Sequence, residues 1–109
     1  MTEQEVVRAL DSIAHLSRLQ IFRLLVVSGK SGTTPKVLSE TLGIPATGLS
    51  FHLKELTHSG LITQERDGRN LIYRAAFTRM NELVSFLTLN CCEGQVCELA
   101  DAQAACKAC

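Results

Sequence analysis

The sequence predicts a mainly α-helical fold that carries a single β-hairpin. Its 109 residues are 46% hydrophobic, which fits one domain with a modest core. Apolar residues recur at helical spacing on both sides of the hairpin region. Two strand-like runs, 61–66 and 70–75, are separated by Asp67-Gly68, a strong turn signal for a hairpin. We therefore expect helices first, then the hairpin, then one last helix.

Two helices are expected before residue 30. Thr2-Glu3-Gln4-Glu5 has the spacing of a capping box, in which the first and last residues bond each other's backbone N–H. Ser17 is the predicted cap of the second helix, and Ser28-Gly29 its predicted end. The apolar stripes expected to be buried are Val6, Val7, Leu10, Ile13 and Ala14 in the first helix and Leu19, Phe22, Leu25 and Val26 in the second.

A short helix follows a polar loop over residues 30–34. Thr34-Pro35 combines an N-cap with a first-turn proline, the position at which proline suits a helix start. Gly43 is its predicted end. The residues expected to face inward are Val37, Leu38 and Leu42.

A longer helix is expected over residues 46–56 after the tight Ile44-Pro45 connection, with Ser59-Gly60 as its stop. Its core stripe comprises Leu49, Leu53 and Leu56, which follow one another at helical spacing. Thr47, Ser50 and Lys54 then fall on another side of the helix.

The last helix follows the hairpin, and Thr78 is its predicted cap. Its apolar residues form a wider arc than one monomer's core requires, so we expect it to lie partly in a subunit interface. These residues are Met80, Leu83, Val84, Phe86, Leu87 and Leu89.

Short helix, tight turn, longer helix and hairpin, in this order, make up a winged helix-turn-helix. In such a fold the longer helix enters the major groove of DNA, while the hairpin, or wing, reaches neighbouring phosphates or the minor groove. Residues 1–90 carry ten Lys and Arg against eight Asp and Glu, and a weakly basic body binds DNA if its cations share one face. The candidate DNA-binding residues are Thr47, Ser50, Phe51, His52, Lys54, Arg66 and Arg69.

Other interpretations of these residues stay open. Thr47 and Ser50 could be ordinary solvated residues, and arginines on a turn are often only solubilising. His52 could pack between helices instead of reading a base. Phe51 could belong to the core or could contact a thymine methyl group. DNA binding is therefore predicted from the order of the elements more than from any single side chain.

The chain resembles the ArsR/SmtB family of small bacterial metal-responsive repressors over residues 1–90. The resemblance rests on residues 16–25, 49–56, 60–62 and 66–69, which read LSRLQIFRLL, LSFHLKEL, GLI and RDGR. It implies that 1–90 is a DNA-binding and dimerisation domain, that a homodimer forms through the first and last helices, and that the dimer leaves its operator DNA when an ion binds. The chain departs from the family pattern at Pro45, where members often place Ser at the recognition-helix cap.

All five cysteines lie in the last nineteen residues, so residues 91–109 form a Cys-rich tail. Crowded soft thiolates suit a thiophilic ion. Cys91, Cys92 and Cys97 resemble the thiol set of an arsenite-responsive branch of the family, and the tail is expected to carry the effector site. As(III) forms three bonds to thiolates, and Sb(III) is its chemical neighbour. We therefore expect As(III) as effector and no permanent cofactor.

The backbone must leave helical geometry for two neighbouring sulfurs to converge, because adjacent helical residues point about 100° apart. Asn90 and Gly94 are placed to permit this. Two other effector sites of the family are missing from the sequence. The arsenic site with a Cys-x-Cys on the short helix is absent, because that helix has no cysteine. The zinc site with Asp, His and Glu on the last helix is absent, because that helix offers only Glu82.

Three alternatives for the cysteines remain. A sensor of Cd, Pb or Zn would recruit Cys106 or Cys109 as a fourth ligand. A thiol redox switch would form a disulfide on the same scaffold, and an unreactive pair would do neither. An enzyme is not expected, because an arsenate reductase would need a Cys followed six positions later by Arg, and neither Cys91 nor Cys92 has one. No secretory signal or membrane-spanning run is visible, so we expect a cytoplasmic protein without a membrane partner.

Overall fold

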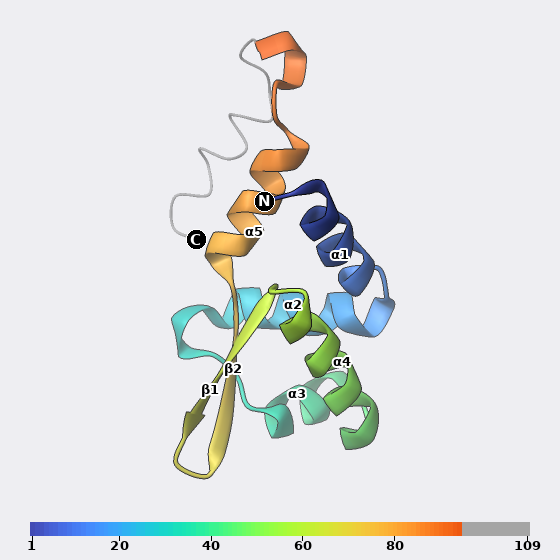
Figure 1. Cartoon of the computed structure of the whole chain (residues 1–109). Coiled ribbons are helices and arrows are strands. Elements are labelled where there is room, and N and C mark those ends of the chain that lie inside the picture. Colours follow the sequence, from blue (N-terminus) through green and yellow to red (C-terminus); the bar gives the residue numbers. More distant parts are fainter. Residues whose placement is uncertain (95–109) are drawn as a thin grey trace.

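The computed structural model describes residues 1–94, and it has the predicted winged helix-turn-helix order (Figure 1). Figure 1 shows α1 and α5 in the upper half of the molecule, α2 across the middle, and α3, α4 and the hairpin below. The elements are α1 Glu3–Ile13, α2 Leu16–Ser28, the 3-10 turn η1 Gly29–Ser31, α3 Pro35–Leu42, α4 Ala46–His58, β1 Ile62–Asp67, β2 Asn70–Ala75, α5 Phe77–Leu87 and the 3-10 turn η2 Cys91–Gly94.

Two of the four predicted side-chain caps are confirmed, and α4 begins at Ala46 as predicted. The capping box of α1 is present: the Glu5 N–H donates to Thr2 Oγ1 at 3.1 Å, and the Thr2 N–H donates to Glu5 Oε1 at 3.0 Å. Thr34 Oγ1 accepts the Val37 N–H at the start of α3, with Pro35 at its first position. Both helices therefore begin where their side chains satisfy the free N–H groups of the first turn.

The predicted caps Ser17 and Thr78 are wrong. Helix α2 begins at Leu16, one residue earlier than Ser17, because His15 is its cap and His15 Nδ1 accepts the Ser17 N–H at 3.2 Å. Helix α5 begins at Phe77, so Thr78 is already helical, and the cap residue Ala76 makes no side-chain hydrogen bond. Neither helix therefore begins at the hydroxyl residue that the sequence indicated.

The hairpin is antiparallel, and its register differs slightly from the prediction. Asp67 pairs with Asn70, so the turn consists of Gly68 and Arg69 instead of Asp67-Gly68. Gly68 has a φ of 64°, which a glycine adopts without strain. At the base of the hairpin Thr33 and Tyr73 exchange backbone hydrogen bonds of 2.9 Å, so the loop before α3 is joined to β2.

One apolar core joins all five helices to the base of the hairpin. The fully buried large side chains within it are Ile21, Leu25, Leu38, Leu49, Leu56, Leu61 and Ile62. Leu49, Leu53 and Leu56 are all buried, as their spacing predicted. Helix α4, the predicted recognition helix, is thus held against the rest of the domain by these leucines.

Several apolar residues that were expected to be buried are exposed instead: Val7, Leu10, Ala14, Leu19 and Val37. Along α1 the small residues Ala9 and Ser12 take the inward positions. Ser12 Oγ lies 2.9 Å from Ser59 Oγ at the end of α4. Because small side chains let two helices approach closely, α1 turns this face to α4, while Val7 and Leu10 face outward.

Residues 1–94 cover the apolar arc of α5 only in part. Leu83 is buried and Met80 and Phe86 are packed against the core. Val84, Leu87 and Leu89 are exposed, and Leu89 lies beyond the end of the helix. Within residues 1–94 no helix has the length and apolar character needed to cross a membrane.

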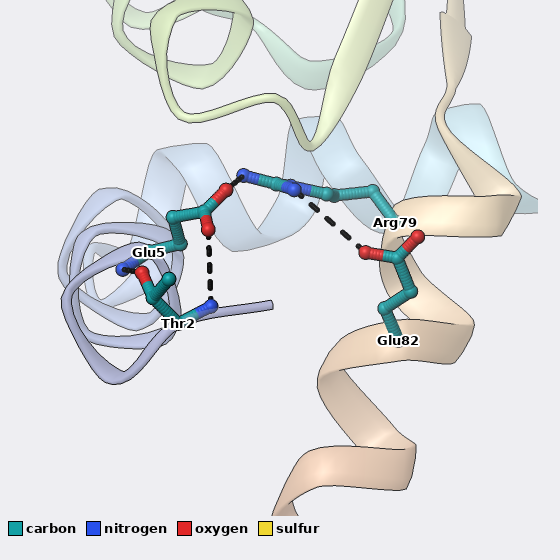
Figure 2. A network of polar contacts seen from close by, with 4 residues as sticks. All are labelled: Thr2, Glu5, Arg79 and Glu82. Carbon is teal, nitrogen blue, oxygen red and sulfur yellow. Dashed lines mark hydrogen bonds and ion pairs between the residues drawn. The ribbon is translucent and has the colours of Figure 1, made fainter.

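Arg79 ties α5 to α1 through the capping box (Figure 2). Its Nη2 donates to Glu5 Oε2 at 2.8 Å, and its Nη1 lies 3.7 Å from Glu82 Oε2. The hydrogen bond from the Thr2 backbone, followed by the bond from Arg79, lowers the pKa of Glu5 to about 2. One carboxylate therefore both caps α1 and holds α5 beside it.

Gly60 gives the Arg79 side chain its room between α4 and the wing. A Cβ at Gly60 would lie 3.1 Å from Arg79 Nε, and the φ of Gly60 is +82°. Arg79 Nε is buried and makes no hydrogen bond within the described part of the chain. Arg79 thus contacts α1 and the connection that leaves the recognition helix, as well as its own helix.

Gly32→Ala is expected to destabilise the protein more than Gly29→Ala. Both glycines have a positive φ, 72° and 62°, so both substitutions carry backbone strain of about 1–3 kcal/mol. Only at Gly32 would a Cβ collide, at 2.6 Å from Ile72 Cγ2 and 2.8 Å from the Tyr73 carbonyl oxygen. The overlap should cost a further ~1–3 kcal/mol. Urea denaturation of both variants measures the difference, and equal losses would contradict the close approach.

Glu5→Gln is expected to lower stability at neutral pH but not at pH 2. Glutamine keeps the capping-box acceptor and removes the charge that Arg79 binds. Since the pKa of Glu5 is lowered from 4.5 to about 2, its stabilising effect is complete above pH 4.5 and disappears as the pH falls toward 2. Urea midpoints of wild type and variant, at one protein concentration, should converge over that range. Glu3→Gln in the same turn is the control, and a Glu5→Gln difference that stays constant with pH would contradict the ion pair.

Candidate nucleic-acid interface

The buried leucines of α4 determine which of its residues face solvent. Leu49, Leu53 and Leu56 point into the core, and Thr47, Ser50, Phe51 and Lys54 are exposed. Ser50 and Phe51 lie three and four residues after Thr47 and four and three residues before Lys54, so the four share one side of the helix. We call this set the outer face of α4. The structure therefore brings together four of the five α4 residues predicted from the sequence.

The wing lies at the same end of the molecule as the start of α4. Figure 1 shows the hairpin tip and the first turn of α4 both at the lower end of the view, away from α5. Arg66 and Arg69 at this tip are exposed. A helix face of hydroxyl, aromatic and lysine groups and a wing tip with two arginines, both at this end of the molecule, have the chemistry that a DNA groove and its phosphates require.

The wing is anchored at its base by Arg74. The Arg74 Nε–H donates to the Lys30 carbonyl oxygen at 2.8 Å, and Nη1 lies 3.3 Å from Glu65 Oε1. Together with the Thr33–Tyr73 pairing, these bonds fix the hairpin to the loop before α3. The tip arginines are therefore carried on a hairpin of defined direction.

His52 packs between helices, which was one of the two interpretations that the sequence left open. It is half-buried, and its Nδ1 accepts the Nε–H of Arg18 at 3.1 Å. Its ring centroid is 4.8 Å from that of His15. Burial, and then the charges of His15 and Arg18, lower the pKa of His52. A neutral ring with an unprotonated Nδ1 is consistent with this contact.

Phe51 is an exposed residue and not part of the core. Its side chain is 55% exposed, and the guanidinium carbon of Arg18 lies 5.3 Å from its ring centroid. Arg18 was missed by the sequence analysis, because 34 residues separate it from His52 and helical spacing relates only neighbours on one helix. The resemblance at residues 16–25 was the only signal near it.

The cysteine site lies only partly within the described residues. Helix α5 ends at Leu87, and Asn90 has a φ of 58°, so the backbone has left helical geometry before Cys91, as was predicted. Cys91 is half-buried in the turn η2, and its N–H donates to the Thr88 carbonyl oxygen at 3.0 Å. The Cys92 side chain and Cys97 lie outside the described residues, as do Cys106 and Cys109. Among the side chains that are described, no three His, Cys, Asp or Glu groups could hold a metal ion together.

Known proteins resemble this chain in sequence and in architecture. A family model described as a helix-turn-helix domain matches residues 13–65. The HTH-type transcriptional regulator YgaV of Escherichia coli strain K12 is 29% identical over 84 residues, which are 77% of this chain and 83% of that protein.

Two solved structures extend the comparison. One is the homodimeric winged helix-turn-helix DNA-binding domain of Mb0332 from Mycobacterium bovis, described as a possible ArsR-family transcriptional regulator. It is 26% identical to this chain with a TM-score of 0.64, and 84% of this chain matches 85% of that one. The other, a possible transcriptional regulator for arsenical resistance, is 26% identical with a TM-score of 0.63 over 91% of this chain and 96% of that one. In sequence and in fold, this chain is therefore similar to transcriptional regulators of the ArsR-like winged helix-turn-helix type.

Proposed function

We propose that the chain is a homodimeric repressor, bound to operator DNA through α4 and the wing and released when As(III) binds its cysteines. The observation that carries the DNA-binding part is the outer face of α4 at the same end of the molecule as the wing tip. An exposed helix face with hydrogen-bonding groups, held by a buried leucine stripe, suits insertion into the major groove. Repression and its relief by arsenic rest on the cysteines that follow α5.

The contacts to DNA divide by their chemistry. Thr47 and Ser50 offer hydroxyl groups to base edges, and Phe51 offers an apolar surface. Lys54, Arg66 and Arg69 supply positive charge for phosphates, Lys54 from the helix and the arginines from the wing tip. His52 supports the helix from behind through its bond to Arg18.

A second copy of the chain would cover the exposed apolar residues of α1 and α5. These residues are Val7, Leu10, Val84, Leu87 and Leu89. The homodimeric Mycobacterium bovis domain has the same architecture, which supports this association. A two-fold dimer would set its two recognition helices about one DNA turn apart, roughly 34 Å.

The effector proposal rests on thiol chemistry and on position. Cys91 and Cys92 follow α5 after a residue of positive φ, where the backbone is no longer helical, and Cys97 comes five residues later in the sequence. Three thiolates match the three bonds of As(III), and Sb(III) has the same preference. The similarity to a possible transcriptional regulator for arsenical resistance supports this choice over other ions.

Release would follow from a change in the end of α5. This helix carries exposed apolar residues of the proposed dimer surface, and Arg79 joins it to α1. Movement of its last turn would therefore disturb both helices of the interface and the spacing of the recognition helices. A hundredfold loss of operator affinity requires a coupling free energy of about 2.7 kcal/mol between the two sites.

Ser50→Ala and Arg69→Ala are expected to weaken DNA binding in different ways. Loss of one base-edge hydroxyl should reduce affinity for the operator about fivefold and leave non-specific binding unchanged. Loss of a phosphate contact should weaken binding to all sequences and reduce the slope of log affinity against log salt by about 1. Fluorescence anisotropy over a range of salt concentrations measures both quantities.

Arg8→Ala is the control for charge, because it removes the same charge from α1, far along the chain from α4 and the wing. Size-exclusion chromatography checks that each variant keeps the wild-type oligomeric state. Unchanged operator affinity in both Ser50→Ala and Arg69→Ala would remove this surface from the proposed interface.

Cys92→Ser is expected to abolish release by arsenite while operator binding without arsenite stays intact. As(III) would lose one of its three sulfur ligands, whereas Cys109→Ser should respond as wild type does. A mobility-shift titration of the reduced protein with arsenite measures this, with zinc, cadmium and an oxidant run in parallel.

Other outcomes of this titration identify the alternatives. Release of wild type by cadmium or zinc but not arsenite, with loss of response in Cys109→Ser, would indicate a four-thiolate metal site. Release by oxidant alone would indicate a redox switch. Release of Cys92→Ser at the wild-type arsenite concentration would contradict the proposed site.

A further inference from the structure

Phe51 is a large apolar side chain on the outer face of α4, among groups that suit hydrogen bonding. It follows Thr47 by four residues and precedes Lys54 by three, so its ring belongs to the face that would enter the groove. A phenyl ring donates and accepts no conventional hydrogen bond. Phe51 is 55% exposed, so much of its apolar surface stays in contact with water in the unbound protein, which is unfavourable. An apolar contact on bound DNA would account for keeping it there.

Arg18 holds this ring from the inner side. Its guanidinium carbon lies 5.3 Å from the Phe51 ring centroid, within the range of a cation–π contact. The guanidinium is itself fixed, since Nε donates to His52 Nδ1 at 3.1 Å and Nη1 donates to the Ser12 carbonyl oxygen at 3.5 Å. Arg18 thereby connects α1, α2 and α4. The orientation of an exposed ring is thus set by a half-buried group with bonds to two other helices.

The chemistry of the major groove limits what such a ring can recognise. Its base edges present donors, acceptors and one apolar group, the C5-methyl group of thymine. Cytosine has no methyl group at that position, and the methyl group is absent from the major-groove edges of both purines. A held phenyl ring therefore distinguishes thymine from the other bases by apolar contact.

We propose that Phe51, positioned by Arg18, reads the 5-methyl group of one thymine in each operator half-site. The proposal rests on the DNA-binding function proposed above and adds the base feature that the helix recognises. Phe51 is the contacting residue. Arg18 is a positioning residue that acts through the ring.

The test uses the full-length protein and an operator selected from a random duplex library. Each thymine of the selected half-site is replaced in turn by uracil, which removes only the methyl group. For wild type, one uracil substitution should weaken binding about fourfold, which corresponds to the usual contribution of one buried methyl group. Phe51→Ala should bind the thymine and uracil duplexes equally at that position. Because Phe51 is exposed, the variant should remain folded, and circular dichroism checks this.

Arg18→Met tests the positioning role. The variant should lose most of the thymine preference, and the dependence of its affinity on salt should match that of wild type, because Arg18 is proposed to act on the ring and not on a phosphate. Lys54→Ala is the control: it should weaken binding and reduce the salt slope while the full thymine preference remains.

The outcomes separate this proposal from the function on which it rests. If wild type binds its operator but no uracil substitution weakens binding, or if Phe51→Ala keeps the preference, the methyl contact is wrong and DNA binding stands. If Arg18→Met keeps the preference, or loses affinity only through a smaller salt slope, the positioning role is wrong. If no sequence is selected from the library, the DNA-binding function itself fails, and the methyl contact fails with it.

Discussion

Burial of the α4 leucines is the constraint on which the rest of this structure depends. Leu49, Leu53 and Leu56 each contribute about 1.5–3 kcal/mol by leaving water, and together they leave the helix one way to rotate against the core. Because the helical period is fixed, this burial also determines which side chains face outward. The orientation of the outer face of α4 is therefore set by the core. Leucines that point away from this face determine the geometry of any DNA contact that it makes.

Helices α1 and α5 and the connection that follows α4 meet at Arg79, which gives the proposed response to arsenic a physical route. Glu5 holds its guanidinium from α1, and Gly60 leaves space for it where α4 passes into the wing. Within residues 1–94 the buried Arg79 Nε makes no hydrogen bond, so it is a group that a second arrangement of α5 could satisfy. A shift of α5 caused at its C-terminal end would thus act on α1 and on the recognition helix through one side chain.

Sequence patterns predicted the fold well where residues close together in the chain determine the local structure. The leucine stripe of α4, the capping box of α1 and the hairpin all follow from local spacing or turn chemistry. These patterns failed where contacts between segments decide: His15 displaced Ser17 as the cap of α2, and Ser12 took an inward position beside Ser59. The contact of Arg18 with Phe51 could not be predicted either, because the two residues lie on different helices. The cysteine site was predicted from residue chemistry and from a resemblance, neither of which supplies its geometry.

Intermolecular nuclear Overhauser effects between operator DNA and methyl-labelled protein test the central claim most directly. The claim is that α4 meets DNA with the face opposite its buried leucines. The account predicts contacts from the Thr47 methyl group to base protons in the major groove, and none from the methyl groups of Leu49, Leu53 or Leu56. Contacts confined to methyl groups of α1 or α5, with Thr47 silent, would contradict it.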